Sequence, residues 1–416
     1  MNGGIQSPVP ARADVVVVGA GPAGAAAAAW AARSGRDVLL VDSSEFPRDK
    51  PCGDALTPRC VSELLQLGLG DWLSTRLKHQ GIKLLGFGGR VDIDYPEPAP
   101  LFGTAIARTI LDDRVRQVAV DEGCRTVLGM KVVDAVRDST GRVAAVVLSG
   151  PSGAHQVQCE HVIVADGARS SFGRILGRQW HQDTVYGVAA RAYIESPRSE
   201  EPWLSMYFEL RSVENAVLPG YGWAFPLGSG LVNVGVGSLA TAKRPADLNM
   251  RRVLEHFVTT KQSEWGFSSA PRDIASALLP MGGAVSGLAG PNWMLVGDAA
   301  ACVNPLNGEG IDYALESGRL AAGLLSSGDL TEAWPQLLQQ KYGRSFSVAR
   351  RMALMITVPQ LLPIGGAVMM KSSRMMNVFV RLQGNLVTDD DVDLVARLWR
   401  GLGVASQRVD QRRPFS

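Results

Sequence analysis

The sequence predicts an α/β protein that combines a Rossmann-like dinucleotide-binding domain, an inserted antiparallel β-sheet and a helical C-terminal region. Three observations predict this class. A Gly-rich turn, GAGPAG, separates an apolar strand from an Ala-rich helix near the N-terminus. Short runs of alternating apolar residues, typical of strands, fill residues 181–289. After about residue 330 the pattern becomes helical.

Composition excludes several classes of function. The 416 residues are 46% apolar, enough to bury a real core in two or three domains or one composite domain, and the formal net charge of +2 makes nucleic acid an unexpected partner. The cysteines are odd in number and form no C-x-x-C pair, which favours a reducing cytoplasm and argues against a metal site: Cys52, Cys60, Cys124, Cys159 and Cys302. The five histidines lie apart, so neither a metal cluster nor a hydrolase triad is expected.

The two ends of the chain differ in character. Residues 1–13 form a polar, Pro/Gly-rich stretch that we expect to be a disordered tail rather than a signal peptide. Residues 352–370 are uncharged, but Pro359, Pro363 and a Gly365–Gly366 pair should break them into short helical pieces. This segment is predicted to be either a membrane-interface segment or a buried helical pair. Farther on, Thr388 is expected to cap a last helix and Gly401 to end it.

The first motif along the chain predicts a dinucleotide site. An apolar strand starting at Asp14 leads into the turn, and a second strand ends on Asp42. In such a turn the first glycine allows the tight bend, the second lets the backbone approach a pyrophosphate, and the third lets helix and strand pack closely. The helix N-terminus attracts the phosphates, and Asp42 is expected to accept a hydrogen bond from a ribose hydroxyl. The residues assigned to the turn are Gly19, Ala20, Gly21, Pro22, Ala23 and Gly24.

Two later motifs favour FAD over NAD. Asp166–Gly167 follows a short apolar strand, and Asp298 follows another strand just before a Pro/Gly loop and a helix. A ligand that touches both the first motif and Asp298, nearly 280 residues apart, must be long, as FAD is. No second G-x-G-x-x-G follows a strand, so a separate nicotinamide domain is not expected.

The stretch GYGWAFPLGSGLVNVGVG predicts a hairpin with one aromatic face. Tyr221, Trp223 and Phe225 occupy alternate positions with only Gly222 and Ala224 between them, so the three rings should share a side of the sheet. Pro226 is expected to end the strand, and Gly228–Ser229–Gly230 supplies turn residues. From this stretch alone, the aromatic face could belong to a packed core or to a cavity.

In this order, the motifs resemble the geranylgeranyl reductase family of flavoproteins, which have the p-hydroxybenzoate hydroxylase fold. The resemblance runs from Asp14 to about Arg400 and rests on GAGPAG, RDKPCGDALTPR, AIARTILDDRV, VADGARSS, YGWAFP with GVG, and GDAAACVNPLNGEGIDYA. It implies a discontinuous FAD-binding domain (14–84, 108–180 and 290–345), a substrate-binding β-sheet domain (85–107 and 181–289) and a helical region (346–416).

The resemblance also implies residue roles. Beside the Gly-rich turn and Asp42, it assigns FAD binding to Lys50, Cys52, Gly53, Arg108, Val132, Asp166, Gly167, Asp298, Gly308, Gly310 and Ile311. It assigns the prenyl chain of a substrate to Tyr221, Trp223, Phe225 and Pro226, which makes the aromatic face a cavity wall. Arg174 stands one position away from its place in the family pattern, so its role stays open.

The implied activity is saturation of a C=C bond in an isoprenoid lipid tail by hydride from reduced FAD, with one isoprene unit of menaquinone as the favoured substrate. Cys52 and Tyr221 are the candidate proton donors, besides an ordered water. The electron donor would be NAD(P)H or a small redox protein, and a lipid substrate implies a peripheral protein on the cytoplasmic side of the cell membrane, with residues 352–370 dipping into it. Alternatives are a geranylgeranyl-lipid or chlorophyll-precursor reductase, a flavin monooxygenase or halogenase of the same fold, and a non-catalytic prenyl-lipid carrier.

Overall fold

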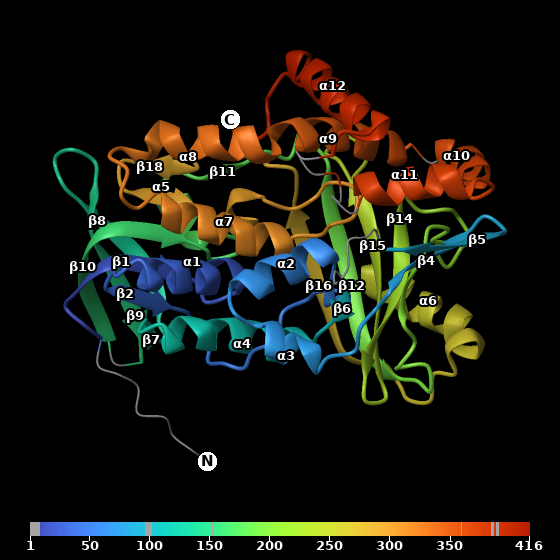
Figure 1. The fold of residues 1–416 in the computed structure, drawn as a ribbon, viewed down its shortest axis with the longest axis horizontal. Coiled ribbons are helices and arrows are strands. Elements are labelled where there is room, and N and C mark those ends of the chain that lie inside the picture. The colour runs from blue at the N-terminus through green and yellow to red at the C-terminus, as the bar shows by residue number, and fades with distance from the viewer. Residues whose placement is uncertain (1–8, 96–101, 152, 359, 384–386, 388–390) are drawn as a thin grey trace.

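The computed structural model describes residues 9–95, 102–151, 153–358, 360–383, 387 and 391–416. Two layered regions lie side by side, and a group of C-terminal helices runs along one side of both (Figure 1). Within the described part of the chain, no helix is both long and apolar enough to cross a membrane.

A mixed sheet forms the centre of the first region. Its strand order is β18-β19-β10-β1-β2-β7, with β9 paired to β10 and β8 to β9. The neighbours from β19 to β7 are parallel, as the alternation of apolar strands and helices predicts. The strands are β1 (Arg12–Val18), β2 (Val38–Val41), β7 (Arg125–Val127), β8 (Lys131–Arg137), β9 (Val143–Gly150), β10 (Gly153–Val164), β18 (Ala289–Gly290) and β19 (Trp293–Leu295).

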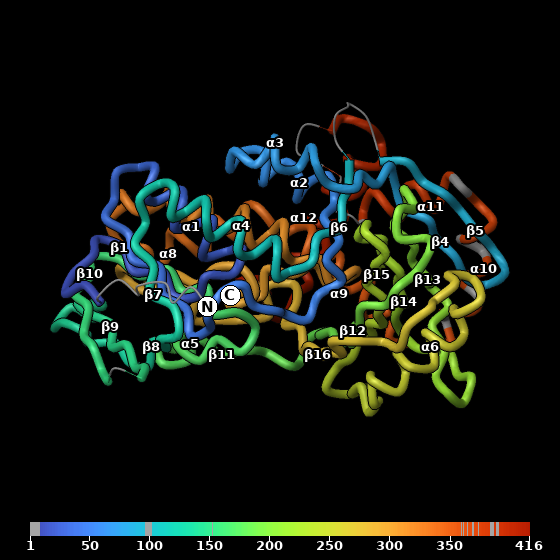
Figure 2. Tube along the Cα trace, turned by 90° about the horizontal axis from the view of Figure 1, so that it is seen from below, coloured from blue at the N-terminus to red at the C-terminus, as the bar shows by residue number. Residues whose placement is uncertain are grey.

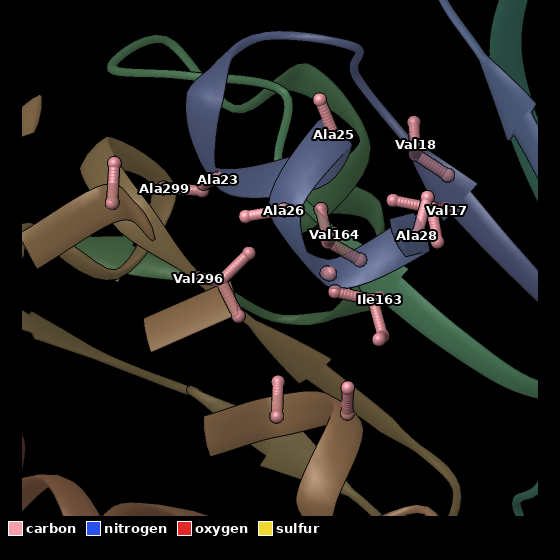
Figure 3. Packing of buried hydrophobic residues seen from close by; sticks show 14 of the residues in the cluster. Val17, Val18, Ala23, Ala25, Ala26, Ala28, Ile163, Val164, Val296 and Ala299 are labelled. Atoms are coloured by element: carbon pink, nitrogen blue, oxygen red, sulfur yellow. The ribbon is translucent and has the colours of Figure 1, made fainter. Parts of the chain in front are cut away.

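Helix α1 (Pro22–Arg33) is the centre of packing in this region. Its alanines pack among Val17, Val18, Ile163 and Val164 of the parallel strands (Figure 3). On its other side Gly318 of α7 lies against the α1 backbone, where a Cβ would stand 2.4 Å from the Ala23 carbonyl oxygen. Small residues on both helices therefore explain the close α1–α7 contact. The region also contains α2 (Pro58–Gln66), α3 (Gly70–Ser74), α4 (Arg108–Asp121), α5 (Ser171–Leu176), the 3₁₀ turn η1 (Gly297–Ala300), α7 (Ile311–Gly323) and α8 (Leu330–Leu338).

The second region is a seven-stranded sheet in the order β16-β12-β15-β14-β13-β4-β5. Every pair is antiparallel except β13 with β4. Helix α6 (Met250–Trp265) covers one face, and the opposite face looks toward the C-terminal helices (Figures 1 and 2). The strands are β4 (Gly81–Gly86), β5 (Gly89–Asp94), β12 (Tyr186–Glu195), β13 (Trp203–Tyr207), β14 (Gly220–Gly228), β15 (Leu231–Ala240) and β16 (Arg272–Pro280). Short pairs β3 (Ala55–Leu56) with β6 (Thr104–Ala105) and β11 (Gln179–Trp180) with β17 (Val285–Ser286) join the regions.

The chain ends in helices. After the π-turn η2 (Gln339–Gly343) come α9 (Arg344–Ile356), α10 (Leu361–Met369), α11 (Ser373–Gln383) and α12 (Leu394–Arg408). Helix α10 includes Pro363, which sits in its first turn where its missing N–H costs little. The prediction that Gly401 ends the last helix is wrong: α12 begins at its cap Asp393, whose side chain accepts from the Ala396 N–H, and continues to Arg408. Thr388 lies outside the described residues.

Some predicted boundaries differ from the structure. Strand β1 starts at Arg12, inside the stretch 1–13 expected to be a tail, and residues 1–8 of that stretch lie outside the described residues. Strand β4 belongs to the second sheet, which therefore begins before residue 85. In the aromatic hairpin, β14 does not stop at Pro226 but continues through a bulge to Gly228.

Candidate functional site

The Gly-rich turn has the geometry that a dinucleotide site needs. Gly19 has φ +103°, and a Cβ there would stand 2.3 Å from the Ala165 carbonyl oxygen. A Cβ on Gly24 would stand 1.8 Å from the Gly19 carbonyl oxygen. Gly21 caps α1, which begins at Pro22, so the free N–H groups of the helix start lie at the turn.

Asp42 holds this turn to the end of β2. Its carboxylate accepts hydrogen bonds from the Ala20 N–H at 2.7 Å and the Ser44 N–H at 2.8 Å. Its backbone carbonyl accepts from the Met130 N–H at 3.0 Å. Val132, two residues farther on, is buried in β8. Asp42, predicted to bind a ribose, and Val132, predicted to bind FAD, therefore lie at the same edge of the sheet.

Arg48 and Arg108 lie on the α1 side of the site. Only Arg108 was predicted from the sequence. Arg108 makes a bidentate pair with Asp112 at 2.6 and 2.7 Å and lines the cavity described below. Arg48 approaches Asp112 at 2.9 Å, and a Cβ on Gly21 would stand 3.2 Å from the other Arg48 nitrogen. The nitrogen that faces Asp112 is Nη1, and the nitrogen beside the Gly-rich turn is Nη2. A guanidinium nitrogen beside the Gly-rich turn is the kind of donor that binds a pyrophosphate.

Asp298 closes the site from the other end of the chain. It pairs with the Lys50 ammonium at 2.7 Å, which joins the two predicted FAD residues across 248 positions. Burial alone would raise the pKa of Asp298, but the Lys50 charge holds it below the ordinary value, so the group is a carboxylate. Gly310 caps α7, whose N-terminus at Ile311 opens into the same space, and Gly308 precedes it with φ +75°.

Asp166 and Gly167 support the site rather than line it. The Asp166 carboxylate accepts from the Ser170 hydroxyl at 2.6 Å and from the Phe172 N–H at 2.8 Å, so it shapes the start of α5. Arg178, which the sequence interpretation missed, is buried and donates to the Ala299 carbonyl at 2.6 Å and the Ala168 carbonyl at 3.3 Å. It ties the Asp166 loop to the Asp298 turn, whereas Arg174 is exposed.

The loop Lys50–Asp54 brings a thiol to the cavity. Cys52 lines the cavity, and its sulfur accepts from the Asp54 N–H at 3.3 Å. Burial raises the pKa of the Cys52 thiol against the lowering effect of the nearby Arg108 guanidinium, so the group is protonated at neutral pH. The buried Arg191 of β12 holds the loop in place through Asp49 and the Lys50 carbonyl.

Asp54 is the centre of a buried network that the sequence interpretation missed. One carboxyl oxygen accepts from the Tyr193 hydroxyl at 2.7 Å and from the Asn233 amide at 2.8 Å. The other oxygen has no hydrogen-bond partner within the described part of the chain. Burial raises the pKa of Asp54 to about 6, although both hydrogen bonds oppose this. Asn233 also donates to the Cys52 carbonyl at 2.9 Å, so the network fixes the thiol loop to β15.

The aromatic hairpin forms as the sequence predicts, and its three rings share one face. Trp223 stacks on Phe225 with centroids 6.1 Å apart, and Tyr221 lies 5.9 Å from Trp223. On the opposite face Gly222 leaves room for Phe257 of α6. Gly53 lies against the aromatic rings of this face, which we call the aromatic wall: a Cβ on Gly53 would stand 3.2 Å from the Phe225 ring. The Tyr221 hydroxyl donates to the Asn307 carbonyl, next to Gly308.

These parts surround one cavity of about 560 Å³. At one end it is lined by Pro22, Lys50, Arg108 and Asp298, and along its length by Tyr221, Trp223 and Phe225. The far end reaches the C-terminal helices, where the apolar lining consists of Met352, Met355, Ile356, Leu362, Met370, Met376 and Phe379. Part of the segment 352–370 therefore lines the cavity. The predicted substrate residue Pro226 is buried without lining it.

The residues present fit FAD. A Gly-rich turn at a helix start and the Arg48 guanidinium beside it suit the pyrophosphate. Asp42 suits the ribose, and Asp298 with the α7 N-terminus suits the flavin side. No cluster of metal ligands occurs within the described ranges.

Comparison with known proteins agrees with this geometry. Residues 12–352 match the family described as FAD binding domain. The chain is 61% identical over 409 residues to the menaquinone reductase of Mycolicibacterium smegmatis, covering 97% of this chain and 99% of that protein. It is 29% identical over 354 residues to digeranylgeranylglycerophospholipid reductase 1 of Methanopyrus kandleri, covering 82% and 90%.

The fold is also found among solved structures. A geranylgeranyl bacteriochlorophyll reductase-like protein from Thermoplasma acidophilum superposes with a TM-score of 0.76 at 20% identity, covering 94% of this chain and 99% of that one. FAD is therefore the cofactor, and the predicted fold class is confirmed. The chain belongs to the FAD binding domain family and, within it, to the menaquinone reductase family of FAD-dependent oxidoreductases.

Proposed function

We propose that this protein saturates one C=C bond in the isoprenoid tail of menaquinone. One observation carries the proposal: a single cavity runs from the FAD residues along an aromatic wall into an apolar end formed by the C-terminal helices. A prenyl tail is apolar and flexible, and flat rings give it large contact area without requiring polar partners. The relative at 61% identity is named menaquinone reductase, which supports menaquinone as the substrate.

The reaction needs a hydride and a proton, one for each carbon of the double bond. Reduced FAD supplies the hydride when bound at the site. The chain itself binds the tail against Trp223 and Phe225, whose rings are nearly fully buried, and keeps water out of the cavity. An isolated alkene has no carbonyl to polarise, so a proton must be held where the second carbon lies.

Cys52 is the better placed of the two predicted proton donors. Its thiol lines the cavity beside the aromatic wall, and its raised pKa keeps the proton on sulfur. The Tyr221 hydroxyl already donates a hydrogen bond to the Asn307 carbonyl. Burial also raises the pKa of this phenol above its ordinary value. We therefore assign proton delivery to Cys52, whose thiolate regains a proton from solvent after each turnover, and assign Tyr221 to the wall.

Electrons and substrate must both come from outside the chain. We propose that NAD(P)H or a small redox protein docks transiently to reduce the flavin, since the sequence has no second dinucleotide motif after a strand. We also propose that the protein works as a peripheral protein at the cytoplasmic side of the cell membrane, because its lipid substrate resides in the bilayer.

The proposal is tested with FAD-loaded protein, chemically reduced without oxygen and mixed with menaquinone in detergent. The lipid is then re-aerated and weighed by mass spectrometry, because a reduced quinone head returns its hydrogens to oxygen whereas a saturated tail keeps them. We expect a persistent gain of two hydrogens, placed in the tail by fragmentation. A product that appears only with oxygen uptake, or the absence of any persistent gain, would overturn the assignment to menaquinone saturation.

A further inference from the structure

The turn between β4 and β5 holds a phenylalanine in a backbone conformation that suits glycine. Gly86 pairs with Gly89 across this hairpin. The two residues between them, Phe87 and Gly88, both have positive φ, +49° and +73°. Two-residue turns of this kind favour Asn, Asp or Gly at the first position, and a bulky residue there is strained. The turn itself therefore does not explain the phenyl ring.

The β14–β15 hairpin of the same sheet allows a direct comparison. Its turn also has two central residues of positive φ, Ser229 at +52° and Gly230 at +86°. The Ser229 N–H donates to the Glu200 carboxylate at 2.7 Å. In the β4–β5 turn the Phe87 N–H donates in the same way to the Glu209 carboxylate at 2.6 Å. One backbone arrangement therefore carries an exposed serine in one hairpin and a half-buried phenylalanine in the other.

The contacts of the Phe87 ring supply the reason. Phe87 lines the cavity, as does Gly366 of α10. A Cβ on Gly366 would stand 2.4 Å from the Phe87 ring, so the ring lies against the bare backbone of that helix. Met370 contacts the same hairpin: a Cβ on Gly89 would stand 2.8 Å from the Met370 Cβ. Phe87 therefore narrows the far end of the cavity, where α10 and α11 lie beside the hairpin (Figures 1 and 2).

A row of rings connects the aromatic wall to this point. The Phe208 ring, which also lines the cavity, lies 6.1 Å from the Tyr221 ring of the wall and 5.7 Å from the Phe379 ring of α11. The Phe208 N–H donates to the Leu85 carbonyl at 2.8 Å, which places Phe208 beside the end of β4. Phe87 follows only two residues after Leu85. An apolar chain that extends along the wall from the flavin side therefore reaches the Phe87 ring.

We propose that Phe87 is a substrate-contacting residue that fixes the register of a prenyl chain against the flavin. Its ring limits how far the chain can slide along the aromatic wall. Because the register decides which double bond lies at the flavin, Phe87 selects the isoprene unit that is saturated. This role rests on the proposed function. The strained backbone agrees with it, since such strain persists where surrounding contacts hold it and is common at ligand contacts.

The variant Phe87→Ser tests the selection with FAD-loaded, full-length protein and menaquinone in detergent. It gives the β4–β5 turn the residue that the β14–β15 turn already carries, so it should fold. The wild type should saturate one position of the tail, whereas Phe87→Ser should saturate more than one, as located by fragmentation in mass spectrometry. The matched control Ser229→Ala changes the exposed turn and should give the wild-type product. Retained flavin and a cooperative thermal transition show that both variants are folded.

The variant Gly366→Ala tests the same contact from the side of α10. Its added methyl group would stand 2.4 Å from the Phe87 ring and must displace it. Gly366→Ala should therefore change the position of saturation in the otherwise wild-type protein. In the Phe87→Ser background, where no ring is present, it should cause no further change.

Three results would overturn the proposal: an unchanged product from Phe87→Ser, an equal change in Ser229→Ala, or the same effect of Gly366→Ala in both backgrounds. Binding of geranylgeraniol, measured by calorimetry in detergent, separates this role from the proposed function. Phe87→Ser should bind this prenyl alcohol at least about fivefold more weakly than the wild type, and Ser229→Ala should bind it equally well. If no enzyme form saturates menaquinone, the proposed function fails. The calorimetry then still decides the contact, because equal affinities of the wild type and Phe87→Ser would show that Phe87 does not touch a prenyl chain.

Discussion

The Trp223 indole N–H donates to the Asn233 side-chain oxygen at 2.9 Å across the β14–β15 hairpin. The same Asn233 amide donates to Asp54 at 2.8 Å and to the Cys52 carbonyl at 2.9 Å. One buried amide therefore joins the aromatic wall to the loop that carries the thiol. This contact fixes the position of the aromatic rings relative to Cys52.

Replacing Asn233 with alanine should lower the free energy of unfolding by about 2 kcal/mol or more, because it removes the hydrogen bonds to the Trp223 N–H and the Cys52 carbonyl and one of the two to Asp54. Urea unfolding of the FAD-loaded protein measures the change. Asn249→Ala is the control: Asn249 is an exposed helix cap whose loss should cost only about 1 kcal/mol. Equal costs for the two substitutions would contradict the role given to Asn233.

Two glycines of β15 offer a matched test of the wall. A Cβ on Gly235 would stand 2.0 Å from the Trp223 ring, whereas a Cβ on Gly237 would meet that ring at an ordinary 3.6 Å. Gly235→Ala should therefore displace the tryptophan, destabilise the fold by about 1–3 kcal/mol and raise KM for the lipid. Gly237→Ala should have little effect on either the stability of the fold or the KM for the lipid. Thermal unfolding and steady-state kinetics give the two readouts, and similar behaviour of the pair would show that the ring does not lie across Gly235.

Sequence patterns predicted the parts of this site that depend on local chemistry. The Gly-rich turn and the one-sided aromatic hairpin follow from residues within a few positions of one another, so periodicity and turn preferences were sufficient. Arg178, Arg191 and Asn233 were missed because their partners lie tens to hundreds of residues away in the chain, and only packing brings them together. Gly401 was misread as a helix stop because α12 is held by contacts with α9, which outweigh the low helix propensity of one glycine.

Cys52 should be required for the proton step and not for cofactor binding. Cys52→Ala should lower the rate of double-bond saturation by about 100-fold, with the FAD affinity unchanged, since general acids contribute about this much. Tyr221→Phe, which removes only the bond to the Asn307 carbonyl, should lower the rate far less. Single-turnover mixing of reduced enzyme with lipid measures both rates. An unimpaired Cys52→Ala enzyme would remove this thiol from the mechanism.

The raised pKa of Asp54 should make stability depend on pH in an unusual direction. The folded-state pKa of Asp54 is about 6, against 3.8 as the ordinary value. Between these values the folded protein holds a proton that the unfolded chain has lost, so stability falls as pH rises. The stability contribution of this group is fully present below about pH 4 and is lost as pH passes through 6. A shift of this size corresponds to a change on the order of 3 kcal/mol.

Asp54→Asn isolates this contribution, because the variant keeps the shape and hydrogen-bonding capacity of the side chain but cannot titrate. Other carboxyl groups contribute equally to both proteins and cancel in the difference. Unfolding free energies measured from pH 4.5 to pH 7.5 should show the wild type losing stability relative to the variant across this range, most steeply up to about pH 6 and levelling off above it. A difference that stays flat, or that grows in favour of the wild type as pH rises, would mean that Asp54 is ionised in the folded protein throughout and that solvent or another group satisfies its second oxygen.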